Sequence, residues 1–347
     1  AGYEVAVHVR CSEHRTVIEQ AGLQVISHNI SRSGLNPFRE LVSVLQLVKV
    51  LRSFRPDVIH LIALKPIVLG SLASIFYPKA KIVNAPVGMG YLFASNDVRA
   101  RLARPLVKLV LKSTLGRKRS MTIIENSDDK TSLVEGRFLH SNQIVLIRGT
   151  GVNLDVFRPT TEPDGPKIVV LIARMLRDKG VFEFVESARI IKRTHPTTLF
   201  WLIGDADPGN PASLTTQQLQ AWNDEGIVEW LGYRTDVADL LTKIHVVCLP
   251  SYREGFGKVF VEAGAALRAV VATDVPGCRE AVEHQINGLL VEPKNSEALA
   301  AALVEVLDND LLRLRLAKEG RRRAEFEFSS ETVNAQTLAV YQQVLGQ

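Results

Sequence analysis

Two glutamates stand in the segment SYREGFGKVFVEAGAA with seven residues between them. Glu254 precedes Gly255, Phe256 and Gly257, and Glu262 lies about two turns into the helix expected to follow. The glycines let the backbone approach a ligand or take a positive φ. Amides at the start of such a helix lack intrahelical partners and can bind phosphate. The alternative is a surface helix whose glutamates are solvated.

A second charged group lies in VVLIARMLRDKG, where a buried strand should end at a loop. The loop carries Arg174, Arg177 and Lys179, and Gly180 begins the next helix. Arginine binds phosphate through two parallel hydrogen bonds, and lysine acts as a point charge. A solvated basic turn is the alternative. Two phosphate-suited loops at strand ends of one domain favour a functional site.

Two further loops leave both interpretations open. Asp205 and Asp207 in WLIGDADPGN match the Asp-x-Asp pattern that holds a divalent metal in some sugar-transfer enzymes. Short acidic turns after strands are common, so we predict no metal there. The segment TDVPGCREAVEHQINGLLVEP places a Pro-Gly turn and a short helix after another strand, which fits a structural or a functional role.

The charge is distributed unevenly over the chain. Residues 1–159 carry a net +11 and the remainder −6. Residues 98–119 form a predicted basic amphipathic helix, which can pack as a domain helix and also contact an anionic membrane. A basic half also suits nucleic acid or a phosphorylated substrate. Interleaved aromatics and a known nucleic-acid module are lacking, so we predict no nucleic-acid partner.

Composition limits the class of protein. The 347 residues are enough for two domains. Three scattered cysteines, Cys11, Cys248 and Cys278, argue for a reducing compartment and against a disulfide framework, which predicts a cytoplasmic protein. No apolar run is long enough to span a membrane. His60 and Lys65 follow a strand near the expected cleft, and we interpret them as ordinary structural residues.

Apolar runs alternate with helical patterns along the whole chain, which predicts βαβ units and doubly wound parallel sheets. The expected strands span residues 4–9, 23–27, 58–61, 81–85, 121–125, 143–147, 167–173, 198–203, 227–231, 245–249, 270–273 and 288–291. Residues 151–167 contain three prolines and no periodicity, so they form a predicted linker. We expect domains at 1–155 and 156–328, and a helix at 329–347 that can pack back on the first domain.

These residues together resemble the family 4 retaining glycosyltransferases, and the likeness covers nearly the whole chain. GVNLDVFRP is similar to the family's interdomain link, LGYRTDVADLL to its base-binding loop and INGLLVEP to its donor-side strand. The resemblance implies the GT-B fold, in which two Rossmann-like domains face a cleft. SHNISRSGLNPFREL, HLIALKP and APVGMGYLF are similar to bacterial enzymes that add sugars to lipid-linked oligosaccharides. Such enzymes often use UDP-hexoses or UDP-N-acetylhexosamines.

The resemblance also implies roles for single residues. Arg174 and Lys179 would hold the donor diphosphate and stabilise the leaving nucleotide. The amides of Gly255–Gly257 would orient the donor. Glu254 would contact the hydroxyls of the donor sugar, and Glu262 those of the ribose.

Arg234 in the base-binding loop and Leu290 in the donor-side strand complete the predicted donor-binding residues. Transfer would retain the anomeric configuration through front-face attack, with the departing phosphate accepting the acceptor's proton. With two cations on the diphosphate, neither a metal nor another cofactor would be required. The acceptor would be a glycan or a lipid-linked saccharide, which fits a cytoplasmic protein at the inner face of a membrane.

The chain departs from the family pattern in two places. It starts after the family's first strand and its glycine-containing loop, so we expect a first domain that lacks this strand and an uncertain activity. The run VNAPVG has no histidine where several relatives carry one, so we assign no base there. Another GT-B enzyme, such as a sugar-nucleotide epimerase, and an inactive fragment or regulatory subunit remain the alternatives.

Overall fold

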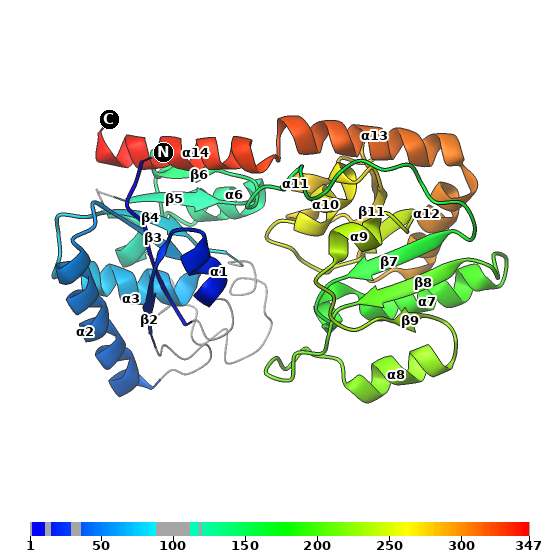
Figure 1. Cartoon of the computed structure of the whole chain (residues 1–347), viewed down its shortest axis with the longest axis horizontal. Helices are drawn as coiled ribbons and strands as arrows, with labels where there is room; N and C mark the ends of the chain where they lie inside the picture. Colours follow the sequence, from blue (N-terminus) through cyan, green and yellow to red (C-terminus); the bar gives the residue numbers. More distant parts are fainter. Residues whose placement is uncertain (1, 11–14, 29–35, 88–111, 118–119, 347) are drawn as a thin grey trace.

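The computed structural model describes residues 2–10, 15–28, 36–87, 112–117 and 120–346. Two lobes lie side by side, each with its own parallel sheet, and helices α13 and α14 run along one side of both (Figure 1). The prediction of two α/β domains with parallel sheets is therefore confirmed.

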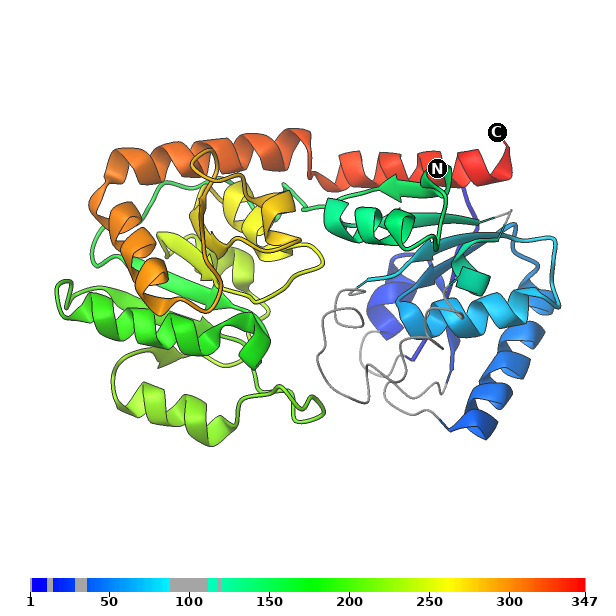
Figure 2. The same ribbon diagram turned by 180° about the vertical axis from the view of Figure 1, so that it is seen from behind.

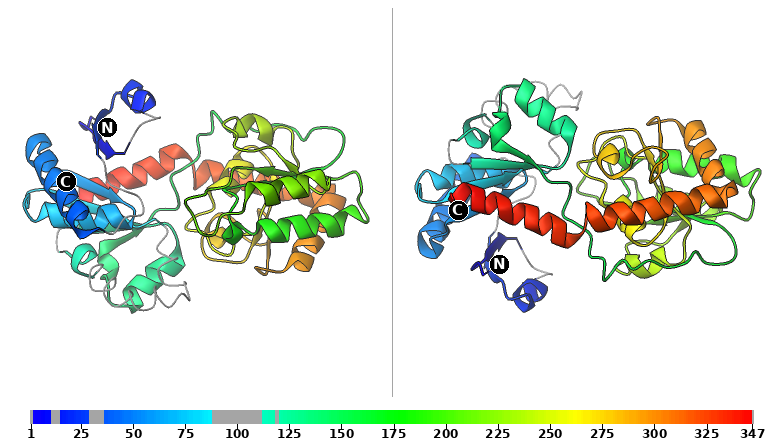
Figure 3. Two further views of the ribbon diagram at one scale, coloured as in Figure 1. Left: turned by 90° about the horizontal axis from the view of Figure 1, so that it is seen from below. Right: turned by 90° about the horizontal axis from the view of Figure 1, so that it is seen from above.

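The first domain contains two separate parallel sheets. Strands β3, β4, β5 and β6 pair in sequence order, and β1 and β2 pair with each other. Figure 3 shows β1, α1 and β2 standing apart from the larger sheet. The strands are β1 (Ala6–Val9), β2 (Gln24–Ser27), β3 (Val58–Ile62), β4 (Lys81–Ala85), β5 (Ser120–Ile124) and β6 (Ile144–Leu146). The helices are α1 (Arg15–Gln20), α2 (Pro37–Phe54), α3 (Leu64–Ser74), α6 (Ser127–Glu135) and the 3₁₀ turn η1 (Ser141–Gln143).

Helix α2 illustrates how local sequence signals start an element. The side chain of Asn36 accepts hydrogen bonds from the amides of Phe38 and Arg39, and Pro37 occupies the first turn. One side of the helix packs on α3 through Val44, Val48 and Leu51, all nearly fully buried, which fixes α2 against the sheet layer.

Most of the predicted basic helix at 98–119 lies outside the described residues. At its described end, the guanidinium of Arg117 donates to the carbonyl oxygen of Ser71 and to Oγ of Ser74, each at 2.8 Å. Burial lowers the pKa of Arg117. This basic residue therefore holds the segment against α3 and does not face solvent freely.

The second domain is a six-stranded parallel sheet in the order β12-β11-β10-β7-β8-β9. The order reverses between β7 and β10, so their loops leave in opposite directions and open a crevice. The strands are β7 (Ile168–Ile172), β8 (Leu199–Ile203), β9 (Glu229–Trp230), β10 (Val246–Leu249), β11 (Ala269–Thr273) and β12 (Leu289–Val291). The helices are η2 (Arg177–Lys179), α7 (Val181–Lys192), α8 (Thr216–Asp224), α9 (Val237–Leu241), α10 (Lys258–Ala265), α11 (Cys278–Ala281), α12 (Ser296–Asp308) and α13 (Asp310–Phe326).

The central strands of this sheet are buried on both faces. Val169, Val247 and Val271 have no exposed surface, and each strand is a continuous apolar run. Such runs are typical of parallel strands covered by helices on both sides. The core therefore holds the carboxyl ends of β7 and β10 in fixed positions.

The chain crosses between the domains twice, and the two crossings are hydrogen bonded to each other. The amide of Val152 donates to the carbonyl of Phe328 at 2.8 Å, and the amide of Ser330 donates to the carbonyl of Val152 at 2.9 Å. Helix α14 (Ser330–Leu345) then lies on the first domain, where Val333 and Val340 pack against β4 and β5 (Figure 2).

Helix α13 is an element that the sequence analysis did not predict. Its arginines interrupt the apolar pattern of the buried face. Arg313 is itself buried and binds both carboxylate oxygens of Glu162, at 2.8 and 2.9 Å. The helix covers the outer face of α10 and thereby supports the segment that carries Glu262.

Candidate active site

The loops after β7 and β10 meet at the point where the strand order reverses. Nζ of Lys179 lies 2.6 Å from Oε1 of Glu254, and Oγ of Ser251 donates to the same oxygen at 2.7 Å. Only 18% of the lysine side chain and 11% of the glutamate side chain are exposed. The site thus places a cation and a carboxylate at the crevice of the second domain.

Close backbone packing holds the two loops together. Gly180 has a φ of 71°, and a side chain on it would overlap the carbonyl oxygen of Pro250. The amide of Tyr252 donates to the carbonyl of Asp178 at 2.9 Å. Glycine is required here because of both its positive φ and this contact, so Lys179 and Glu254 are positioned by the backbone.

Arg174 lies at the rim of the same crevice. Its Nη1 pairs with Oδ2 of Asp207 at 2.9 Å, and half of the arginine side chain is exposed. Oδ1 of Asp205 accepts a hydrogen bond from the amide of Tyr233 at 3.1 Å. Both aspartates suggested as metal ligands are thus engaged with protein groups. Within the described ranges, no three His, Cys, Asp or Glu residues gather in a way that could hold a metal.

Gly255, Phe256 and Gly257, which we call the glycine tripeptide, differ in part from the expectation. Gly257 has a φ of −79°, so positive φ is not its purpose, and a side chain there would instead overlap the ring of Phe260. The amides of Gly257 and Lys258 are also not free, because they donate to the carbonyls of Gly277 and Phe256. The expected row of unpaired amides is therefore partly occupied.

Glu262 lies on α10 and is mostly buried. Loss of hydration raises the pKa of its carboxyl group, and Lys258, 3.4 Å away, opposes the rise. A carboxyl group with few protein partners in a sheltered position is suited to accept hydrogen bonds from hydroxyl groups.

Two predicted donor-binding residues lie apart from the Lys179–Glu254 pair. Arg234 is in the exposed loop after β9, where Asp236 accepts from its guanidinium at 2.8 and 2.5 Å. Leu290 is on β12, and its amide donates to Nδ1 of His284 at 3.0 Å. Among the described residues, no hydrogen bond or ion pair links either residue to Lys179 or Glu254.

The first domain contributes residues that the sequence analysis missed. Nδ2 of Asn126 donates to the carbonyl of Gly255 at 3.0 Å, inside the glycine tripeptide. Arg253, directly before Glu254, pairs with Asp129 at 3.2 Å. Asn126 is the N-cap of α6, and the polar run that follows β5 was a signal for this contact.

Glu280 is the second link between the domains. Its Oε1 accepts from the amide and hydroxyl of Ser127, at 2.6 and 2.5 Å, and its Oε2 pairs with Nε of Arg148 at 2.5 Å. Burial alone would raise the pKa of Glu280, but these hydrogen bonds hold it below its ordinary value. We call Asn126, Ser127, Asp129, Arg148, Arg253, Gly255 and Glu280 the interdomain network.

Glu125 directly follows β5, and its carboxyl group lies near that of Glu254 in the second domain. Burial raises the pKa of its carboxyl group, and the nearby charges of Asp129 and Glu254 raise it further. Carboxyl groups from both domains therefore approach each other beside the Lys179–Glu254 pair.

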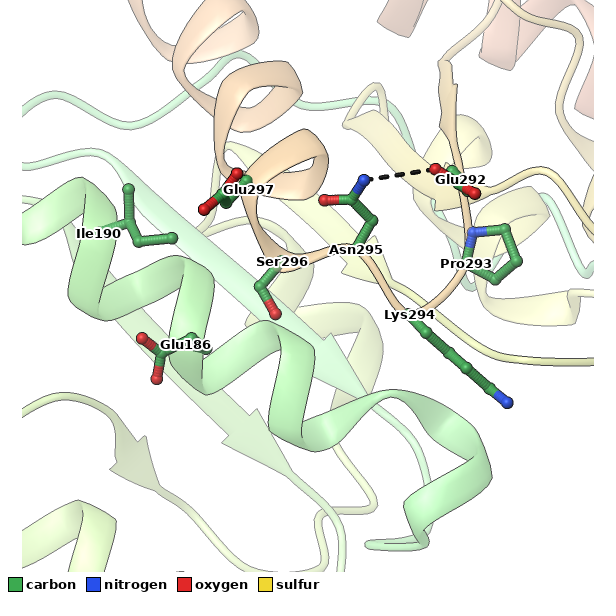
Figure 4. Close-up of a pocket in the computed structure, with 8 residues that line it drawn as sticks. All are labelled: Glu186, Ile190, Glu292, Pro293, Lys294, Asn295, Ser296 and Glu297. Carbon is green, nitrogen blue, oxygen red and sulfur yellow. Dashed lines mark hydrogen bonds between the residues drawn. The ribbon is translucent and has the colours of Figure 1, made fainter.

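Two cavities are relevant to the location of the site. A hollow of about 370 Å³ lies between α7 and the start of α12, where Asn295 donates to Glu292 at 3.3 Å (Figure 4). None of its lining residues is one of the predicted site residues. A cavity of about 190 Å³ lies on the first domain and includes Glu125 and Gly149. The smaller cavity is the one that adjoins the candidate active site.

Comparison with known proteins decides the family. Residues 154–323 match the model "Glycosyl transferases group 1", and residues 1–119 match "Glycosyl transferase 4-like". The N,N'-diacetylbacillosaminyl-diphospho-undecaprenol alpha-1,3-N-acetylgalactosaminyltransferase of Campylobacter jejuni is 31% identical, covering 99% of this chain and 92% of the relative. The chain belongs to the family 4 glycosyltransferases.

A second relative is the UDP-Gal:alpha-D-GlcNAc-diphosphoundecaprenol alpha-1,3-galactosyltransferase of Escherichia coli. It is 23% identical over 81% of this chain and 74% of its own length. The Lys179–Glu254 pair of this glycosyltransferase lies within the residues that match the group 1 model.

Solved structures agree on the fold. A glycosyltransferase from Rickettsia africae superposes with a TM-score of 0.78 at 20% identity, covering 99% of this chain and 91% of that one. The Anabaena protein HepE in complex with UDP and glucose gives a TM-score of 0.78 at 21% identity, with coverages of 97% and 91%. The predicted GT-B fold is thereby confirmed. Among the helices that the structure describes, none combines the length and hydropathy needed to cross a bilayer.

Proposed function

We propose that this glycosyltransferase moves a hexose or N-acetylhexosamine from a UDP-sugar to a lipid-linked saccharide, with retention of anomeric configuration. The observation that carries the proposal is the sheltered Lys179–Glu254 pair at the crevice between β7 and β10. The named activities of the Campylobacter and Escherichia relatives support the lipid-linked acceptor.

The proposed reaction depends on cations that bind the diphosphate and carboxylates that bind the hydroxyl groups of the donor. An ammonium group has three donors, and Glu254 takes one from Lys179, so two remain for a diphosphate. Arg174 at the exposed rim would turn from Asp207 to a second phosphate oxygen. Both cations stabilise the negative charge that develops on the leaving UDP. Glu254 would accept hydrogen bonds from the sugar hydroxyls, and Glu262 from the ribose.

We also propose that the reaction needs no divalent metal. Lys179 and Arg174 supply the positive charge that a metal ion would otherwise provide at the diphosphate. Oδ1 of Asp205 already accepts a hydrogen bond from the amide of Tyr233.

Titration calorimetry with UDP and GDP, with and without EDTA, tests the donor assignment. We expect UDP to bind more tightly than GDP and EDTA to have no effect. If neither nucleotide binds, the donor site is wrong. If EDTA abolishes binding, the metal-free proposal is wrong.

The stereochemistry and the acceptor need a transfer assay. UDP-sugars are offered with alpha-D-GlcNAc diphosphate attached to a long-chain lipid, and the anomeric configuration of the first product is read by proton NMR. Retention gives a new alpha linkage from the alpha-linked donor. A beta-linked product would contradict the retaining mechanism, while UDP binding would remain unaffected.

The first domain also has a face that suits a membrane surface, and we propose that the cytoplasmic protein associates peripherally there. Phe38, Leu41, Val42 and Leu45 stand at positions i, i+3, i+4 and i+7 of α2, which places them on one face of the helix, and all four are more than half exposed. An exposed apolar stripe on a positively charged domain is typical of contact with anionic lipid. Flotation with anionic vesicles should show binding that Leu45→Ser weakens, and equal binding of this variant would contradict the assignment.

A further inference from the structure

The aromatic residue of the glycine tripeptide lies beside the places where the chain passes between the domains. Phe256 follows Glu254 by two positions. The centroid of its ring lies 5.5 Å from that of Phe328, and the two ring planes are tilted by 55°. Phe328 is 1% exposed, and its carbonyl accepts the hydrogen bond from the amide of Val152 that joins the two crossings. The loop that carries Glu254 therefore packs on the second crossing, at residues 328–330.

The same ring also packs on the first crossing, at residues 149–152. A Cβ atom placed on Gly149 would lie 2.3 Å from Cδ1 of Phe256 and 2.6 Å from Cε1 of the same ring. Carbon atoms that are not bonded to each other are about 3.5–4.0 Å apart at their optimum, so the ring occupies the space that a side chain at Gly149 would need. Phe256 thus contacts both crossings at once.

The backbone beside Phe256 is held by long hydrogen bonds. The amide of Glu254 donates to the carbonyl of Pro276 at 3.3 Å, and the amide of Gly257 donates to the carbonyl of Gly277 at 3.3 Å. Hydrogen bonds of this kind usually measure about 2.7–3.2 Å, so these two are at the weak end of the range. The packing of the Phe256 ring therefore adds fixation that these bonds provide only weakly.

Lys179 is positioned by other contacts. A side chain on Gly180, which follows it, would overlap the carbonyl oxygen of Pro250, and the amide of Tyr252 donates to the carbonyl of Asp178. These contacts lie before Glu254 in the chain and do not involve the ring of Phe256. A shift of the ring should therefore displace the carboxylate while the lysine stays in place.

We propose that Phe256 is a positioning residue: its ring, packed on both crossings, sets the place of the Glu254 carboxylate relative to the first domain. This inference rests on the proposed function, in which Glu254 binds the donor sugar. A change in the crossings displaces the ring, and with it the loop that carries the carboxylate. Turnover should therefore depend on the crossings, whereas UDP affinity, which depends on Lys179, should not.

Two glycine variants provide the matched comparison. Gly149 and Gly226 have almost the same φ, 70° and 69°, so a Cβ atom strains the backbone equally at both. At Gly226 it meets no heavy atom within 4 Å, whereas at Gly149 it meets the ring of Phe256. Gly149→Ala should lower kcat by about tenfold or more, since a misplacement of about 1 Å can cost about 100-fold in rate. Gly226→Ala should keep the wild-type kcat, and equal kcat values for the two variants overturn the proposal.

A double-mutant cycle shows whether the effect of Gly149→Ala passes through the ring. Phe256→Ala removes the atoms that the new methyl group would meet, so Gly149→Ala should change kcat by less than about twofold in that background. Calorimetry should find the UDP affinity of each single variant within about twofold of the wild type. An equal loss of kcat from Gly149→Ala in both backgrounds overturns the proposal, and so does a large loss of UDP affinity.

Hydrogen exchange of the full chain without nucleotide measures the same contact without turnover. Phe256→Ala, and to a smaller extent Phe256→Leu, should speed exchange at the amides of Glu254 and Gly257, while β7 exchanges as in the wild type. Unchanged exchange at both amides overturns the positioning role. If the wild type fails to bind UDP, the proposed function fails, whereas the exchange rates still decide whether Phe256 holds the loop.

Discussion

Each domain contains a sheltered lysine–glutamate pair, and the two pairs have the same length. Lys179 and Glu254 are 2.6 Å apart in the second domain, and Lys65 and Glu40 are 2.6 Å apart in the first. The Lys65–Glu40 pair joins α2 to the start of α3. The Lys179–Glu254 pair joins two loops at the point where the strand order reverses. Ion-pair geometry alone therefore does not identify a site, and the place in the fold does.

The largest expected effect separates the two lysines. Lys179→Met should weaken UDP binding by about 10- to 100-fold, because a charge-assisted hydrogen bond contributes about 1.5–3 kcal/mol. Lys65→Met should leave UDP affinity unchanged and lower the stability of the first domain. Calorimetry and thermal unfolding of both variants make the measurement. Equal UDP affinities would remove the distinction between the pairs.

The two glutamates should separate in turnover. Glu254→Gln keeps the shape of the side chain but accepts hydrogen bonds less strongly, so kcat should fall by about 100-fold with little change in UDP affinity. Glu40→Gln should keep the wild-type kcat. Steady-state kinetics with the productive UDP-sugar provides the values. A normal kcat for Glu254→Gln would show that the carboxylate does not act on the donor sugar.

The stability that the interdomain network contributes to the fold should depend on pH. Because the pKa of Glu280 is lowered in the folded protein, its ionised form stabilises the fold at neutral pH, and this contribution is lost as the pH falls through the folded value. Glu280→Gln should cost about 1–3 kcal/mol at neutral pH. The difference from the wild type should shrink in acid. Urea unfolding over a pH series measures it, and a gap that stays constant would contradict the role of the charge.

The smallest effect is expected at the exposed loop after β9. Arg234 is exposed and is already bound to Asp236 by two hydrogen bonds. Arg234→Ala should therefore weaken UDP binding only about two- to fivefold, since exposed ion pairs contribute little. Calorimetry decides this, and a loss as large as that of Lys179→Met would place the base-binding loop among the main contacts.

The positions of Lys179 and Glu254 at strand ends could be predicted from the sequence, because a strand end is recognised from local sequence. Lys179 and Glu254 each follow an apolar run, and parallel strands bring their carboxyl ends to one edge of a sheet. Lys179 and Glu254 are 75 positions apart, yet each could be placed at a strand end independently. Of the two roles expected for Gly257, a positive φ is not the one observed, because the ring of Phe260, rather than the turn, excludes a side chain there. The close approach of its backbone to a ligand stays a prediction.

The remaining features depend on contacts between distant segments. Ser127 and Glu280 are 153 positions apart and belong to different domains, so no local pattern predicts their hydrogen bond. Helix α13 escaped prediction because Arg313 and Arg323 are buried among its apolar residues. A buried arginine that is fully paired interrupts the apolar periodicity on which sequence-based recognition of helices depends.

The paired crossings at Val152 and Ser330 have a mechanical consequence. Two connections placed far apart would hold the domains at two points and restrict their rotation. Two connections tied by backbone hydrogen bonds at one place act as a single pivot, and the interdomain network is what opposes rotation of the domains about that point. Because α14 is attached to the first domain and α13 to the second, the bend between these helices would report the angle of that rotation directly.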